Sequence, residues 1–112
     1  MIYKPFDIVR VPFPFTDKEK SKMRPALVIS SEQYHQRTEH VIAVMITSAK
    51  NSAWSFDIPI HSKTAHLPVP SKIRFKVFAL DIRLMAGKIG VLDKETSALV
   101  VDQLKQIFAY GV

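Results

Sequence analysis

The sequence predicts a mainly β fold: a small barrel or strongly curved antiparallel sheet that carries one C-terminal helix. Short runs rich in Val, Ile and Phe recur along the chain between polar or Pro-containing segments, as in short strands joined by loops. Residues 94–111, near the end of the chain, instead have apolar side chains at helical spacing. Because 112 residues make one domain-sized core, we expect a single domain spanning residues 1–112.

The first two predicted strands form a hairpin. Residues 7–13 (DIVRVPF) and 24–30 (RPALVIS) are rich in β-forming side chains, whereas residues 14–23 are too polar for a core and too long for a tight turn. Pro25 keeps the residue before it extended and has no N–H for a ladder, so Arg24 and Pro25 mark the start of the second strand. We expect the loop to cover one face, with Arg24 at its mouth.

The middle of the chain contains shorter elements. Residues 31–40 allow a short helical turn, and residues 41–48 (VIAVMITS) have the length and apolar character of a buried strand. Residues 55–60 predict another short strand, and residues 61–71, which contain two prolines, predict a loop.

Residues 72–93 alternate polar and apolar side chains, as expected of a half-buried antiparallel strand. One face of its first half is apolar and the other basic: Ile73, Phe75 and Val77 against Lys72, Arg74 and Lys76. The basic stripe is about 13 Å long at ~3.3 Å per residue, which suits either a solvated surface or the phosphates of a nucleic acid. Trp54 and Phe56 suit either stacking on a base or anchoring the barrel.

The last segment predicts an amphipathic helix. Asp93 is a suitable N-cap. An apolar stripe at i, i+4, i+7 and i+8 follows, made of Val100, Leu104, Ile107 and Phe108. Gly111 is expected near the end of the helix.

Charge and composition limit the function. Sixteen Lys and Arg against ten Asp and Glu give a net charge of +6 and a pI near 9.7, which favours a polyanionic partner or reflects a soluble protein that is merely basic. The absence of cysteine excludes disulfides, zinc–thiolate sites and thiol nucleophiles. The sequence shows no signal peptide and no apolar run of the roughly 20 residues that span a membrane, so we expect a cytoplasmic protein that does not use a membrane.

Common catalytic patterns are missing from the sequence. The four histidines fall in loop-like segments at spacings that do not match a helical metal site, so we expect surface histidines and no metal. Three glycines cannot form a phosphate-binding loop, and the carboxylates are dispersed. We therefore expect no cofactor.

Several motifs in a fixed order resemble the MazF/PemK family of toxin endoribonucleases from type II toxin–antitoxin systems. They are DIV at residues 7–9, PFPFTD at 12–17, RPALVIS at 24–30, ITS at 46–48, a leucine and serine at 67 and 71, and LDIRL at 80–84 before KIG at 88–90. The resemblance runs from residue 7 to the C-terminal helix. It implies an SH3-like barrel, a symmetric homodimer, and metal-independent, sequence-selective cleavage of single-stranded RNA.

The resemblance also implies roles for individual residues. The arginine of RPA and the threonine of ITS, here Arg24 and Thr47, would face the scissile phosphate. If the RNA 2′-hydroxyl attacks its own phosphorus, the protein has to stabilise a phosphorane, for which a guanidinium and a hydroxyl are suited. The proton acceptor stays unassigned, because arginine is a poor base and no histidine falls on a motif position. We expect RNA contacts from further residues: Lys20, Lys22, Ser48, Ser71, Lys72, Arg74 and Lys76.

Three positions depart from the family pattern. Phe6 stands where a glycine is usual, Met23 where a basic residue is frequent, and Ala79 where a threonine is usual, so a weakened enzyme is one expectation. Two alternatives stay open: a non-catalytic SH3-like module that binds nucleic acid or peptide, and a gyrase poison of the CcdB type, which the lack of a C-terminal tryptophan disfavours. A basic groove also suits a cognate antitoxin with an acidic disordered segment.

Overall fold

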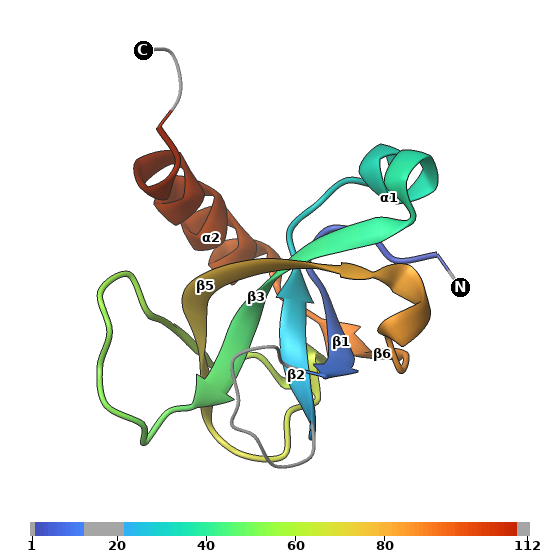
Figure 1. Cartoon of the computed structure of the whole chain (residues 1–112). Helices are drawn as coiled ribbons and strands as arrows, with labels where there is room; N and C mark the ends of the chain where they lie inside the picture. The colour runs from blue at the N-terminus through green and yellow to red at the C-terminus, as the bar shows by residue number, and fades with distance from the viewer. Residues whose placement is uncertain (1, 13–21, 110–112) are drawn as a thin grey trace.

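The computed structural model describes residues 2–12 and 22–109, and shows six strands, two α-helices and two 3₁₀ turns (Figure 1). The elements in chain order are β1 (Asp7–Pro12), β2 (Met23–Val28), α1 (Glu32–Thr38), β3 (His40–Ser48), β4 (Ile58–Ile60), η1 (Lys63–Ala65), β5 (Ser71–Asp81), η2 (Ile82–Leu84), β6 (Lys88–Val91) and α2 (Lys94–Ile107). All strand pairs are antiparallel and form one sheet in the order β4-β5-β3-β2-β1-β6. The predicted mainly β fold with a C-terminal helix is confirmed.

Alternating residues of the strands point into two apolar clusters, because successive side chains of a strand lie on opposite faces. Ile8 and Leu27 belong to the cluster beneath α2, whereas Val9 and Val28 belong to the cluster on the other face. All four side chains are fully buried. The sheet is therefore buried on both faces, which ties down the strands whose ends carry the site.

The two edges of the curled sheet approach each other through η1. An ideal Cβ placed on Gly90 of β6 would lie 2.5 Å from the carbonyl oxygens of both Thr64 and Ala65, so only glycine allows this contact. Two side chains of the same segment donate to β6: Thr64 Oγ1 to the Val91 carbonyl at 2.9 Å and His66 Nδ1 to the Ile89 carbonyl at 3.3 Å. We call this contact between η1 and β6 the seam.

The helix α2 begins as predicted and ends earlier. The Asp93 carboxylate accepts the backbone N–H of Thr96 at 3.0 Å, and this bond lowers the pKa of Asp93. Val100 is fully buried and Leu104 and Ile107 pack on the core, but Phe108 is the C-cap and half exposed, so its place in the apolar stripe was wrong. Gly111 lies outside the described residues.

The long strand β5 is interrupted by a bulge that the sequence did not reveal. Val44 of β3 lies opposite Val77, but the next residue, Met45, lies opposite Arg74. Because two residues of β5 fall between these pairs, odd and even side chains keep their faces: Phe78, opposite Ala43, is buried in the cluster on the face away from α2, whereas Val77 is exposed. Ile73 and Val77 lie opposite Ile46 and Val44, which both belong to the cluster beneath α2, so the predicted shared face holds, but Val77 is not buried on it. The segment is also three elements rather than one strand, namely β5, η2 and β6.

One histidine is internal, contrary to the prediction of four surface histidines. His35 of α1 is buried; its Nε2 lies 2.6 Å from Ser30 Oγ, and its Nδ1 donates to the Tyr3 carbonyl at 3.0 Å. The ring therefore ties α1 to the N-terminal segment and to the end of β2.

In the described part of the chain, no helix has the length and apolar character needed to cross a membrane.

Candidate functional site

Arg24 and Thr47 lie at neighbouring strand ends and line the same cavity. β2 starts and β3 finishes at the end of the sheet opposite α1 (Figure 1). Ala26 lies opposite Met45, and continuing this antiparallel register by two residues brings Arg24 level with Thr47. Both side chains line a cavity of about 590 Å³, hereafter the site cavity. The two residues with predicted catalytic roles are thus brought together.

The guanidinium of Arg24 is available for a ligand. Arg24 is exposed, and its side chain makes no hydrogen bond or ion pair with any residue that the structure describes. Its backbone is held in β2 opposite Val11. Arg10, from the outward face of β1, lines the same cavity. Two arginines and no carboxylate among the described lining residues make the site cavity suitable for an anion.

The hydroxyl of Thr47 is oriented by a side chain that follows β3. Asn51 Nδ2 donates a hydrogen bond to Thr47 Oγ1 at 2.6 Å, and Asn51 also lines the site cavity. A hydroxyl that accepts from an amide still has its own hydrogen to donate. The Thr47 O–H is therefore left for an acceptor such as a phosphate oxygen.

Ser48 and Ser71, predicted to bind RNA, lie opposite each other in the β3–β5 ladder and line the site cavity. Ser48 Oγ accepts the backbone N–H of Lys50 at 3.4 Å, while Ser71 is buried and donates to the Val69 carbonyl at 2.8 Å. The Ser71 hydroxyl is thus engaged in shaping the wall of the cavity. Lys22 is exposed just before β2, and Lys20 lies outside the described residues.

The predicted basic stripe on β5 is not a row of free cations. Lys72 Nζ donates to the Asn51 carbonyl at 2.6 Å and lies 3.4 Å from Asp57 Oδ2; the side chains of Lys72 and Asp57 are 11% and 12% exposed. Arg74 binds the same carboxylate through Nε at 3.2 Å and Nη2 at 2.9 Å. Two of the three stripe residues are thus paired inside the protein, and neither lines the site cavity. The contact of Lys72, Arg74 and Lys76 with RNA phosphates stays a prediction, and the sequence did not reveal that Asp57 pairs with two of them.

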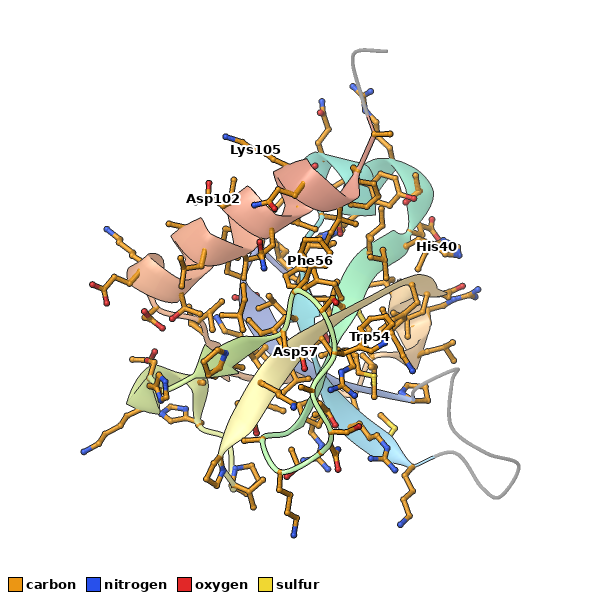
Figure 2. All side chains as sticks on the ribbon, turned by 90° about the vertical axis from the view of Figure 1, so that its left-hand side faces the viewer. His40, Trp54, Phe56, Asp57, Asp102 and Lys105 are labelled. Atoms are coloured by element: carbon orange, nitrogen blue, oxygen red, sulfur yellow. The ribbon has the colours of Figure 1, made fainter. Side chains whose placement is uncertain are left out.

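Asp57 holds this cluster together electrostatically. Burial would raise the pKa of Asp57, but hydrogen bonds from Arg74 and the Trp54 amide, with the nearby charges, outweigh it and lower the pKa. The Asp57 carboxylate correspondingly raises the pKa of Arg74. The loop before β4, which carries Trp54 and Asp57, passes over β5 (Figure 2). We call the group of Asp57, Lys72 and Arg74 the Asp57 cluster.

The aromatic residues of this loop are exposed rather than central to the barrel. Trp54 is 48% and Phe56 41% exposed, and Phe56 lies near α2, where Gln103 Nε2 donates to its carbonyl at 3.3 Å (Figure 2). The cations of Arg74 and Lys76 lie 5.8 and 5.6 Å from the centre of the Trp54 ring. Lys76 and Arg74 therefore face the indole, and Trp54 covers β5 outside the site cavity.

Three polar lining residues escaped the sequence analysis: Arg10, Asn51 and His66. Arg10 had a detectable signal, since it is a charged residue between the apolar residues Val9 and Val11 of β1. Asn51 and His66 had none, because a turn and a long connection between β4 and β5 bring them to the cavity.

Among the described residues, no three His, Cys, Asp or Glu side chains are grouped closely enough to hold a metal ion.

Comparison with known proteins identifies a toxin family. The family model of the PemK-like, MazF-like toxin of type II toxin–antitoxin systems matches residues 4–108. No curated protein sequence matches the chain significantly.

Several solved structures share the fold. MazF from Deinococcus radiodurans is 23% identical, with a TM-score of 0.76 and 96% of each chain covered. A mycobacterial endoribonuclease solved with its cognate antitoxin is 13% identical, with a TM-score of 0.72, 94% of this chain and 91% of that chain covered. For the Mycobacterium tuberculosis toxin MazF-mt6 the identity is 16%, the TM-score 0.72, and the coverage 89% and 93%.

Proposed function

This chain belongs to the PemK-like, MazF-like toxin family of type II toxin–antitoxin systems, and we propose that it is an endoribonuclease that cleaves single-stranded RNA without a metal. One observation carries the proposal: the guanidinium of Arg24, which has no partner among the described residues, shares a cavity with the Thr47 hydroxyl, whose hydrogen is not donated to any of them. Two structural neighbours, a mycobacterial endoribonuclease and the toxin MazF-mt6, agree with it.

The proposed reaction uses a nucleophile from the substrate. The ribose 2′-hydroxyl attacks the adjacent phosphorus, and the O5′–P bond breaks. The protein has to stabilise the charge on the phosphorane oxygens, which requires positioned donors rather than a protein nucleophile. Arg24 supplies a planar fork of N–H groups that matches two phosphate oxygens, and Thr47 supplies one O–H. Losing one such donor typically costs about 2.7 to 4 kcal/mol of barrier.

Substitutions at these two residues test the assignment on a long mixed-sequence RNA in the presence of a chelator. Arg24→Lys should lose activity nearly as far as Arg24→Ala, because it keeps the charge but not the fork. Thr47→Ser should keep much of the rate, whereas Thr47→Val should lose about 10² to 10³ in turnover.

Thermal melts serve as the control, since both side chains line a cavity rather than the core and folding should survive. Arg24→Ala and Thr47→Val proteins that both cleave at the parent rate would refute the assignment. Intact RNA with a mobility shift for the parent protein would instead favour a non-catalytic binding module.

The proposal extends to partners. The mycobacterial relative was solved with its cognate antitoxin, and we expect this chain to bind an antitoxin whose acidic disordered segment complements a net charge of +6. A homodimer is also part of the proposal. Apolar side chains exposed at Met23 in the hairpin and at Leu99, Val101 and Phe108 in the C-terminal region support it, since these are the two regions expected at the interface.

A further inference from the structure

We propose that His66 is the general base of the cleavage reaction, accepting the proton of the attacking 2′-hydroxyl. The inference rests on the proposed function and adds the group that the Arg24 and Thr47 pair lacks. His66 follows η1 and lines the site cavity together with both residues. No motif pointed to it; the seam brings it there.

The chemistry of the cavity wall leaves few candidates for a base. The titratable side chains among its described lining residues are those of Arg10, Arg24 and His66. An arginine stays protonated and cannot accept a proton at ordinary pH. An imidazole ordinarily exchanges its proton between pH 5 and 8 and is the most frequent general base in proteins. Of the described lining residues, His66 is therefore the one with the chemistry for the task.

The hydrogen bond of the ring determines which nitrogen is basic. His66 Nδ1 lies 3.3 Å from the Ile89 carbonyl, and a carbonyl can only accept, so Nδ1 carries the hydrogen. In the neutral ring the lone pair is then on Nε2. Nε2 has no hydrogen-bond partner within residues 2–12 and 22–109. The contact with β6 thus fixes the ring and leaves the basic nitrogen unoccupied.

The backbone at His66 is in a conformation that residues other than glycine adopt infrequently. Its φ is +53°, in the left-handed region, and its N–H donates to the Lys63 carbonyl at 3.1 Å to end η1. Glycine or asparagine fits such a position with less strain. A strained residue that also lines the site cavity is the combination found at functional sites.

The proposed step is balanced without any further reactant. The 2′-oxygen bonds to phosphorus while its proton moves to His66 Nε2. The O5′–P bond breaks, giving a 2′,3′-cyclic phosphate and a 5′-oxygen that takes a proton from water. The imidazolium then returns its proton to solvent.

Single-turnover cleavage of an RNA that the parent protein cuts tests the proposal. His66→Asn suits the left-handed backbone, and its amide can still donate to the Ile89 carbonyl, but it is not a base. We expect a loss of about 10² to 10⁴ in rate, with the affinity for an uncleavable analogue, 2′-deoxy at the scissile ribose, changed less than threefold. His66→Gly should lose activity similarly and regain at least tenfold when free imidazole is added. His40→Asn is the matched control, because His40 starts β3 at the opposite end from Thr47, and it should cleave at the parent rate.

The outcomes separate the two proposals. If the parent protein leaves RNA intact, the proposed function fails, and this inference with it. If the parent cleaves, the inference alone is overturned when His66→Asn cleaves at the parent rate, or when its loss of rate is matched by an equal loss of affinity for the analogue. It is also overturned when His66→Gly binds the analogue normally but gains no activity from imidazole. Retained analogue binding also shows that a slow variant is folded.

Discussion

Replacing Gly90 by alanine should open the seam between η1 and β6. The new Cβ would lie 2.5 Å from two backbone oxygens, those of Thr64 and Ala65, whereas ordinary contact begins at 3.4 Å. Because both obstacles are main-chain atoms, no side-chain rotation relieves the clash. The η1 segment has to move away by about 0.9 Å, which is the difference between the two distances.

The expected loss of stability follows from two contributions. Inserting one methyl group into a tight contact usually costs about 1 to 3 kcal/mol. Moving η1 also weakens the bonds from Thr64 to Val91 and from His66 to Ile89, which are each worth about 0.5 to 1.5 kcal/mol when fully lost. A total of about 2 to 4 kcal/mol should lower the melting temperature by roughly 8 to 16 °C in a domain of this size.

Urea unfolding followed by circular dichroism measures the change in unfolding free energy, and amide exchange locates it. Exchange at the N–H groups of Ala65 and His66, which donate within η1, should accelerate in Gly90→Ala. Gly87→Ala is the contrasting variant, because its Cβ meets no atom within 4 Å and its cost comes from a φ of +113° alone. It should leave exchange at Ala65 and His66 unchanged. A Gly90→Ala protein as stable as the parent would refute the packing argument.

Two further predictions concern the polar contacts beside the site. Asn51→Asp replaces a donor to Thr47 by an acceptor that draws the Thr47 O–H away from substrate, so turnover should fall about 10² to 10³. Asn51→Ala only removes the donor and should lower turnover less than about tenfold. Equal RNA-cleavage rates for the two variants would contradict the argument that Asn51 orients the Thr47 hydroxyl. Asp57→Asn should lower the unfolding free energy by about 1 to 3 kcal/mol at pH 7, because Arg74 and Lys72 lose their counter-charge. The folded pKa of Asp57 lies below its ordinary 3.8, so the stability that the carboxylate contributes is present above pH 3.8 and disappears as the pH falls further. The unfolding free energies of parent and variant should therefore converge in acid. A difference in unfolding free energy that stays constant down to about pH 2 would contradict this.

The strands and α2 could be predicted from the sequence because the patterns that specify them are local. Alternating apolar residues, Pro25 at the start of β2 and Asp93 at the start of α2 each act within a few positions. The bulge in β5 could not be predicted, because nothing in residues 72–81 marks the point at which the pairing with β3 shifts. His35 was misplaced for a similar reason, since its burial depends on Ser30 and on Tyr3, distant in sequence.

The candidate site was predictable in part. Arg24 and Thr47 were found through ordered motifs, and the register of β2 and β3 brings them to one cavity. The ion pairs of Lys72 and Arg74 were not predicted, because strand periodicity gives the direction of a side chain but not its partner, and Asp57 comes from a separate loop. His66 needs the whole seam to be in place before it reaches the cavity, which no local pattern encodes.

The seam also protects the edges of the sheet. A free edge strand presents unpaired backbone groups on which another chain can form a strand. On β6 the Ile89 and Val91 carbonyls already accept from His66 and Thr64, and the 3₁₀ segment that covers them cannot continue a ladder. The opposite edge, β4, has three residues and a proline at its centre, which lacks an N–H. The two edge strands of the described sheet therefore offer little template for intermolecular β-pairing, so a contact that shapes the cavity wall also guards against aggregation.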